Sequence, residues 1–585
     1  MTLYLFRTNS IRRAWIGFVV ITSIFLGSWA HAEKLSAEGK ASFMRLAENI
    51  PAAATYSLLV GDLRGLVVNS ELILKKYQQS DPTFQFDKFI LSVKGSLGYN
   101  PFSPSEIMAM GIDLDYGVAV FSLSDKSTPI IIAKALDANQ AAKSVENMAE
   151  QLGQAKPCTD RVFGGATVRY FTKSGTQGEK PIMAYARRGN MIYVMAEPPD
   201  ETWFTRHLKV ALDLTKAESM ANEKSFSSML GRLEAKTSLV VYNNYAQYLK
   251  TLKENAKELR SQIETRMPEE KKKSIDTTAP LAFLDTIAEF AGGFNAQIFA
   301  ISLQSDKLTF AHELVGNKKR VDEFAKLFAV SGETKLNQLD LSGDIIGSLL
   351  GNINGQQFAS FLSKKNPTIK KRLDRWRSQL QEEAGLSFDK DILENINGEM
   401  AALFYGINTL PKDIVYGQGM TELQIASQIK LVFAVVIKDA ARTKGALKQA
   451  EGILQSKGKA VTSFDERGEK FLEVSPDGVP LQFGVYKNYF LLGFGKDALK
   501  TALSGTDLKL PVAKDILGQL KFNLQKFVPT MESFKPPLDS PNTQLHQQYK
   551  VWKEQAAPKV NFVKGLDARA VKLPDGFSTR GEIRF

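Results

Sequence analysis

The side chains that could carry out acid–base or metal chemistry are few and widely separated in this sequence. It has four histidines: His31, His207, His312 and His546. No H-E-x-x-H motif, G-x-S-x-G turn or phosphate-binding glycine loop occurs, so a triad or a histidine metal site needs distant segments to come together. His312 alternates with Phe310 and Leu314 on the apolar face of a predicted strand, which favours a packed core histidine over a tuned catalytic imidazole.

The most conspicuous carboxylate pair is Asp113 and Asp115. Glycoside hydrolysis needs two carboxyl groups facing each other across a cleft, and a calcium loop needs further oxygen ligands and a distal glutamate that this segment lacks. The spacing therefore favours an acidic turn or helix cap. We predict no metal site and no cofactor, and a protein that is not an enzyme. A hydrolase with a dispersed acidic site remains an alternative.

The strongest local charge signal is a run of basic residues on one predicted helix: Lys364, Lys365, Lys370, Lys371, Arg372, Arg375 and Arg377. Ile369, Leu373, Trp376 and Leu380 recur at helical spacing, so the helix has one apolar face and one basic face. Such a face is suited to anionic lipid headgroups or an acidic partner. The alternative is a core helix whose basic side is merely solvated.

The N-terminal residues 1–32 have the features of an export signal. Arginines 7, 12 and 13 precede an apolar run from Ala14 to Trp29, and Ala30-His31-Ala32 fits a signal-peptidase site. The apolar run is shorter than the roughly 20 residues that span a bilayer, although an uncleaved anchor remains the alternative. We predict an exported protein of a Gram-negative bacterium, periplasmic or peripheral to the outer membrane, with no transmembrane helix after cleavage.

The composition is that of a multidomain globular protein. The 585 residues are 44% hydrophobic and 24% charged. Removal of the signal leaves 72 Lys and Arg against 63 Asp and Glu, a net charge of +9 that favours anionic partners, while export argues against nucleic acid. Cys158 is the single cysteine, so no internal disulfide can form.

The same succession of segments occurs twice. Asp81-Pro82-Thr83 and Asn366-Pro367-Thr368 each lead into an amphipathic helix, and Gly117 and Gly398 each begin a predicted buried strand. Two further strands end at Asp137 and Asp439, each a predicted helix N-cap. Each copy then has a hairpin, about Gly189-Asn190 or Lys487-Asn488, and ends in another, from Phe294 to Leu314 or from Asn561 to Phe585.

These patterns predict an α+β fold of two tandem related units, each a mostly antiparallel sheet with covering helices. We place the first unit at 33–325 and the second at 326–585. A helix from about Tyr248 to Lys273 is an expected insertion in the first unit. The alternative fold class is α/β, with a doubly wound sheet.

The duplicated pattern resembles a bacterial family of exported proteins known as domain of unknown function three-three-five-two. The likeness rests on an opening strand between Pro51 and Leu63, the strand starts at Gly117 and Gly398, and the paired hairpins. It implies an envelope location and a duplicated α+β architecture, and it carries no catalytic residues. We therefore expect a non-catalytic envelope protein that binds a macromolecular partner or the envelope surface, or alternatively a carrier of a lipid or other apolar ligand.

Overall fold

The computed structural model describes the chain from Ala37 to Phe585 except for residues 124–128, 154, 158–159, 164–165, 174–180, 197–207, 246–292, 329–334, 366, 409–426, 506–509, 511–515 and 532–542. Contacts divide the described chain into an N-terminal unit, residues 37–317, and a C-terminal unit, residues 318–585. Within this part of the chain, no helix combines the length and the apolar composition needed to cross a bilayer. Each unit is described by itself below.

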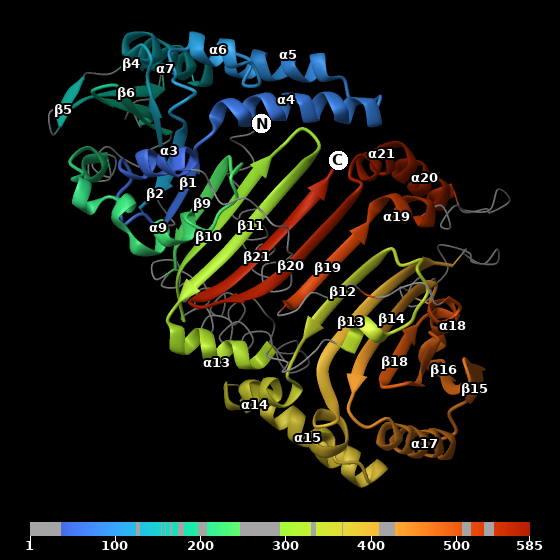
Figure 1. Cartoon of the computed structure of the whole chain (residues 1–585). Coiled ribbons are helices and arrows are strands. Elements are labelled where there is room, and N and C mark those ends of the chain that lie inside the picture. The colour runs from blue at the N-terminus through green and yellow to red at the C-terminus, as the bar shows by residue number, and fades with distance from the viewer. Residues whose placement is uncertain are drawn as a thin grey trace, which may run out of the picture. The chain divides into compact units, whose positions relative to one another are not determined.

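The N-terminal unit is built on an antiparallel sheet (Figure 1). Its central strands are β1 (Tyr56–Val60), β2 (Val118–Ser122), β3 (Ile130–Lys134) and β9 (Leu239–Asn244). The others are β4 (Ala155–Pro157), β5 (Arg161–Phe163), β6 (Ala166–Lys173), β7 (Pro181–Arg188), β8 (Met191–Ala196), β10 (Phe294–Leu303) and β11 (Lys307–Gly316). The strand order is β11–β10–β9–β1–β2–β3–β8–β7–β6, and β4 and β5 both pair with β6. The strand that begins the unit therefore lies in the middle of its sheet.

Helices lie on both faces of the N-terminal sheet. They are α3 (Ala37–Ala47), α4 (Leu63–Ser80), α5 (Phe86–Leu97), α6 (Pro104–Ala109), α7 (Ala138–Gly153) and α9 (Lys224–Leu230), with short 3-10 turns η1 (Lys216–Glu218) and η2 (Met220–Asn222). Phe43 of α3 and Phe226 of α9 belong to the main core, together with Ala184 and Ala186 of β7. Val145 of α7 packs in a separate cluster with Tyr185. Since Ala184 and Tyr185 are adjacent on one strand, α7 covers the face opposite α3 and α9.

The C-terminal unit is also built on an antiparallel sheet. Its strands are β12 (Gly347–Asn352), β13 (Ile396–Ile407), β14 (Ile429–Ile437), β15 (Val461–Glu466), β16 (Glu469–Val474), β17 (Leu481–Tyr486), β18 (Tyr489–Phe494), β19 (Ile516–Asn523), β20 (Gly565–Leu573) and β21 (Gly576–Arg584). The strand order is β21–β20–β19–β12–β13–β14–β18–β17–β16–β15. Position by position, this order corresponds to that of the N-terminal unit.

The C-terminal helices follow a similar succession. They are α13 (Lys318–Phe328), α14 (Gly355–Lys365), α15 (Pro367–Ala384), α17 (Ala440–Ser456), α18 (Ala498–Leu503), α19 (Leu524–Met531), α20 (Thr543–Val551) and α21 (Ala557–Phe562), with short segments η3 (Lys335–Gln338), η4 (Phe388–Leu393), η5 (Pro476–Gly478) and η7 (Trp552–Ala556). Leu499 of α18 packs on Leu403 in the core. Phe527 of α19 stacks against Phe404, which points to the other face of β13.

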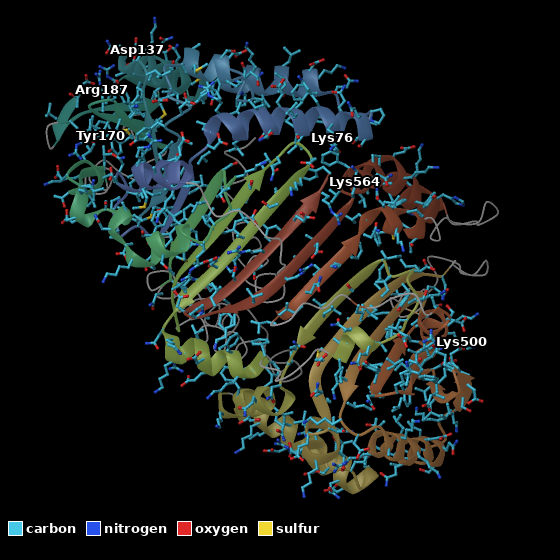
Figure 2. All side chains as sticks on the ribbon, in the orientation of Figure 1. Lys76, Asp137, Tyr170, Arg187, Lys500 and Lys564 are labelled. Atoms are coloured by element: carbon cyan, nitrogen blue, oxygen red, sulfur yellow. The ribbon has the colours of Figure 1, made fainter. Side chains whose placement is uncertain are left out.

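Several local predictions are confirmed. The carboxylate of Asp137, labelled in Figure 2, accepts the backbone N–H groups of Asn139 and Gln140, and that of Asp439 accepts the N–H of Arg442. Both are therefore N-caps, as the sequence predicts. The predicted hairpins are present as β7–β8, β10–β11, β17–β18 and β20–β21.

The fold class is α+β. Every described strand pair is antiparallel, so the alternative of a doubly wound α/β sheet is wrong. Gly117 has a φ of +90°, and a Cβ there would lie 2.2 Å from the carbonyl oxygen of Val60. Gly398 has a φ of +101° at the corresponding place. The helix predicted from Tyr248 to Lys273 lies outside the described residues.

Candidate anionic-surface site

The predicted basic helix is α15 of the C-terminal unit. It begins at Pro367, whose missing N–H suits the first turn of a helix, and ends before Gly385, which has a φ of +60°. Leu373 and Leu380 are half-buried, and α15 packs against α14, η4 and α17. These two leucines therefore take part in packing within the unit, and the side chains of Ile369 and Trp376 lie outside the described part of the structure.

The basic side of α15 faces solvent. Lys370, Lys371 and Arg375 are exposed, as is Lys364 at the end of α14. No described carboxylate lies within ion-pairing distance of these four side chains. On a helical projection, Lys371 and Arg375 lie opposite the positions of Leu373 and Leu380. The side chains of Lys365 and Arg372, the other predicted members, lie outside the described part of the structure.

Arg377 lies apart from this exposed group because it is held by two carboxylates. Its Nε and Nη2 atoms each lie 2.9 Å from a carboxylate oxygen of Asp389, and its Nη1 lies 2.9 Å from Asp374. A bidentate arginine–carboxylate pair of this kind fixes geometry as well as charge. Arg377 therefore ties α15 to η4. Its charge is largely balanced before any ligand arrives.

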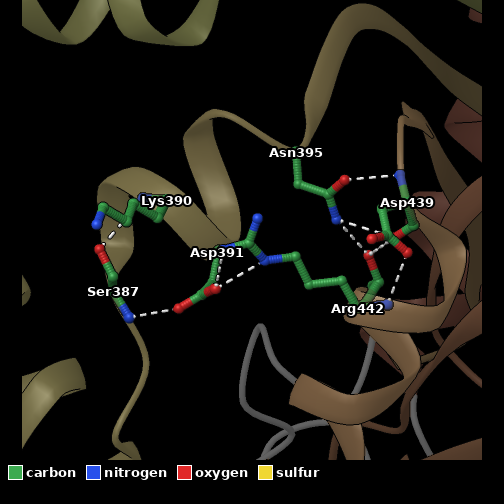
Figure 3. Close-up of polar contacts among 7 residues, drawn as sticks. Ser387, Lys390, Asp391, Asn395, Asp439 and Arg442 are labelled. Carbon is green, nitrogen blue, oxygen red and sulfur yellow. Dashed lines mark hydrogen bonds and ion pairs between the residues drawn. The ribbon is translucent and has the colours of Figure 1, made fainter.

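A polar network fixes η4 to α17, as Figure 3 shows. The carboxylate of Asp391 accepts the backbone N–H of Ser387 at 2.7 Å, and lies 2.6 Å from the guanidinium of Arg442. These contacts hold the pKa of Asp391 below its usual range. Asn395 accepts the N–H of Asp439 at 2.8 Å and donates to its carbonyl oxygen at 3.1 Å. The basic helix is thereby attached to the sheet through η4 and α17.

Sequence reasoning missed this supporting network. Asp389 and Asp391 pair with Arg377 and Arg442, which are 12 and 51 residues away in the sequence. The sequence did contain a local signal for the start of η4, because Ser387 accepts the N–H of Lys390 as the cap of this short helix. No local signal existed for Arg442.

Asp113 and Asp115, the conspicuous carboxylate pair of the sequence, have structural partners. Asp113 accepts the N–H groups of Asp115 and Tyr116, and its other oxygen lies 2.9 Å from Lys134. Asp115 pairs with Arg64 at 2.8 Å, which lowers the pKa of its carboxyl group. The segment is an acidic turn that joins strands and helices. The lowered pKa of Asp115 is the opposite of what a general acid needs.

The histidines are placed differently from one another. His312 is buried on β11, where burial lowers its pKa to about 4, so the imidazole is neutral near pH 7. His546 lies on α20, and His207 lies outside the described residues, as does Cys158. Across the described segments, no group of three or more His, Cys, Asp or Glu side chains has an arrangement that could hold a metal ion.

An apolar row crosses the C-terminal sheet. Leu349 of β12 pairs with Ala402 of β13, which in turn pairs with Phe433 of β14. Leu349 is 37% exposed and Phe433 is 39% exposed. Large apolar side chains in the middle of a sheet are usually covered, so this row offers contact area to an apolar molecule.

Comparison with known proteins adds no family to this geometry. A scan of protein families, a search of curated proteins and a search of solved structures each returned no match. The functional argument therefore depends on the site alone.

Proposed function

We propose that this chain is an exported, non-catalytic protein of the bacterial cell envelope that binds an anionic lipid surface through α15. The observation that supports the proposal is the group of exposed cations at Lys364, Lys370, Lys371 and Arg375, which have no described ion partner. Cations presented together near a membrane are attracted by the negative potential of acidic headgroups.

The binding is electrostatic. Leu373 and Leu380, the apolar side chains of α15 that the structure describes, are half-buried within the unit, so the proposal assigns binding to the cations and not to insertion of these two leucines into the bilayer. Each lysine or arginine near an anionic surface contributes about 1 kcal/mol, and salt screens the attraction. Affinity is therefore expected to fall steeply as ionic strength rises.

The test is vesicle co-sedimentation of residues 33–585, with vesicles of pure phosphatidylcholine or with about a third phosphatidylglycerol. The wild type is expected to pellet with the anionic vesicles alone, and to be released by about 0.5 M salt. The variant Lys370→Glu/Lys371→Glu/Arg375→Glu is expected to bind about a hundredfold more weakly or worse, at about 1 kcal/mol for each cation lost.

The matched control is Lys88→Glu/Lys143→Glu/Lys209→Glu in the N-terminal unit. These exposed lysines have no described ion partner, and the control changes the net charge by the same amount. It is expected to bind within about twofold to threefold of wild type, since under the proposal a charge outside α15 acts only through the screened field of the whole protein. Equal loss in both variants, or unchanged pelleting of the α15 variant, would contradict the proposal. If the protein binds an acidic protein and not the vesicles, the partner of α15 is a macromolecule and not a lipid surface.

We further propose that the two units are copies of one ancestral unit. The shared strand order supports this, as do the corresponding caps at Asp137 and Asp439 and the positive φ angles at Gly117 and Gly398. The resemblance to the family of unknown function and the periplasmic or outer-membrane location stay part of the same proposal. Secretion assays on the full chain, with mass measurement of the mature N-terminus, test the predicted cleavage after Ala32.

A second candidate function is that of a carrier for a lipid or other apolar ligand. The row of Leu349, Ala402 and Phe433 favours it, because the row is apolar and incompletely covered. Native mass spectrometry of the protein purified from the envelope without harsh detergent is expected to show a stoichiometric lipid adduct. The variant Phe433→Lys is expected to lose that adduct, whereas Val551→Lys, at an exposed position on α20, keeps it. If the wild type and the Val551→Lys variant both show the mass of the protein without a lipid, the carrier function is excluded.

A further inference from the structure

A hollow in the N-terminal unit is lined by polar and cationic side chains. It has a volume of about 560 Å³ and lies where α3, η2 and α9 meet, with Gly231 and Arg232 completing its wall. η2 contacts both α3 and α9, and these contacts bring Lys40 and Arg232 to the same hollow although they are far apart in the sequence.

Three cations line this hollow, and no acid does. Lys40 comes from α3, Lys224 from α9 and Arg232 from the segment after α9. Lys40 and Lys224 have no described ion partner. Asn222, Ser227 and Ser228 add an amide and two hydroxyl groups, all of which can donate hydrogen bonds to an oxyanion. Like charges gathered in one hollow raise the local positive potential, and an anion between them relieves it.

The guanidinium of Arg232 is held in place by Ser228 and Glu313. Its Nη2 donates to the hydroxyl of Ser228 at 3.1 Å, and its Nη1 lies 3.6 Å from Glu313. Glu313 is fully buried on β11, whereas the side chain of Arg232 is 25% exposed. A guanidinium fixed in this way does not have to be ordered on binding.

We propose that this hollow binds a phosphate group, either free phosphate or a phosphomonoester carried on a larger molecule. A phosphomonoester has a charge of about −1.5 to −2 near pH 7 and three strong acceptor oxygens, which match three cations and neighbouring hydroxyl donors. The hollow is larger than one phosphate ion, so it leaves room for the organic part of a monoester. The site is in the other unit from α15 and is independent of the vesicle-binding proposal.

Isothermal titration calorimetry of residues 33–585 with inorganic phosphate and with glycerol phosphate tests the inference. At low salt and pH 7.5, saturable binding with a dissociation constant below about 1 mM is expected for at least one of the two. Tighter binding of inorganic phosphate would mark a site for the free ion, and tighter binding of glycerol phosphate a site for a monoester. At pH 5 the affinity for glycerol phosphate is expected to fall, because the second ionisation of a phosphomonoester lies near pH 6.

The variants are Lys40→Gln, Lys224→Gln and the double substitution. Each single variant is expected to bind about threefold to tenfold more weakly, and the double variant about tenfold or more, because each removes one charge-assisted hydrogen bond. Lys236→Gln is the matched control, since Lys236 is exposed and does not line the hollow; it keeps wild-type affinity.

Thermal melting gives a second measurement that also checks folding. About 10 mM of the tighter ligand is expected to raise the melting temperature of the wild type and of Lys236→Gln, and to leave the folded double variant unchanged. The inference is overturned if neither ligand saturates the wild type, or if a folded double variant binds as tightly as wild type.

Discussion

His312 makes the N-terminal unit sensitive to acid. Its imidazole is 3% exposed, its Nε2 atom has no hydrogen-bond partner among the described residues, and burial lowers its pKa to about 4. In the unfolded chain the pKa returns to about 6.5. Between pH 6.5 and pH 4 the unfolded state therefore binds a proton that the folded state does not. Stability contributed by the neutral imidazole is complete above pH 6.5 and is lost as the pH falls through this interval.

The substitution His312→Leu removes this titration. Within the interval each pH unit costs the wild type about 1.4 kcal/mol from this group, so its melting temperature is expected to fall more steeply than that of the variant between pH 6.5 and 4.5. Differential scanning calorimetry across pH 4.5 to 8 measures both slopes. From pH 7 to 8 the two curves should run parallel, and parallel curves at every pH would show that His312 does not titrate as described.

At the scale of elements, the ion pair between Arg377 and Asp389 has a structural role. It joins α15 to η4, and neutralising both partners leaves the net charge of the protein unchanged. The double variant Arg377→Gln/Asp389→Asn is therefore expected to bind anionic vesicles within about twofold of wild type. Its unfolding free energy is expected to fall by less than about 1 kcal/mol, as is usual for a solvent-accessible pair.

The single variant Lys371→Gln serves as the comparison for the Arg377→Gln/Asp389→Asn double variant. It removes an exposed cation without a described partner, so vesicle affinity is expected to fall about fivefold with no change in stability. Co-sedimentation and thermal melting of the two variants separate the roles. Strong loss of vesicle binding in the double variant would place Arg377 among the lipid-binding residues after all.

Elements whose signals are local could be predicted from the sequence. Asp137 and Asp439 reach backbone groups two or three residues away, and Gly98 ends α5 with a φ of +80°, so a short window of sequence contains the whole interaction. The hollow of Lys40, Lys224 and Arg232 had no such signal. Its cations come from separate segments that only the packing of α3 and η2 on α9 brings together.

At the scale of the whole molecule, the antiparallel sheets followed from the alternation of apolar residues and from the hairpin turns. The strand order could not be predicted from these signals, because β1 pairs with β2 on one side and, on the other, with β9, which is far away in the sequence. Apolar alternation shows which face of a strand is buried and leaves its neighbours undefined. The exposure of Leu349 and Phe433 was unpredictable for the same reason, since their sequence pattern is that of an ordinary core strand.

The central position of β1 has a consequence for the order of events during synthesis. Tyr56 pairs with Asn243, so one edge of β1 has no partner until nearly all of the N-terminal unit has left the ribosome. β12 is placed in the same way, with Leu349 paired to Leu520. Contacts between such distant residues slow folding, because a long loop must close before they form. Each sheet can therefore be completed only when its final hairpin, β10–β11 or β20–β21, has been synthesised.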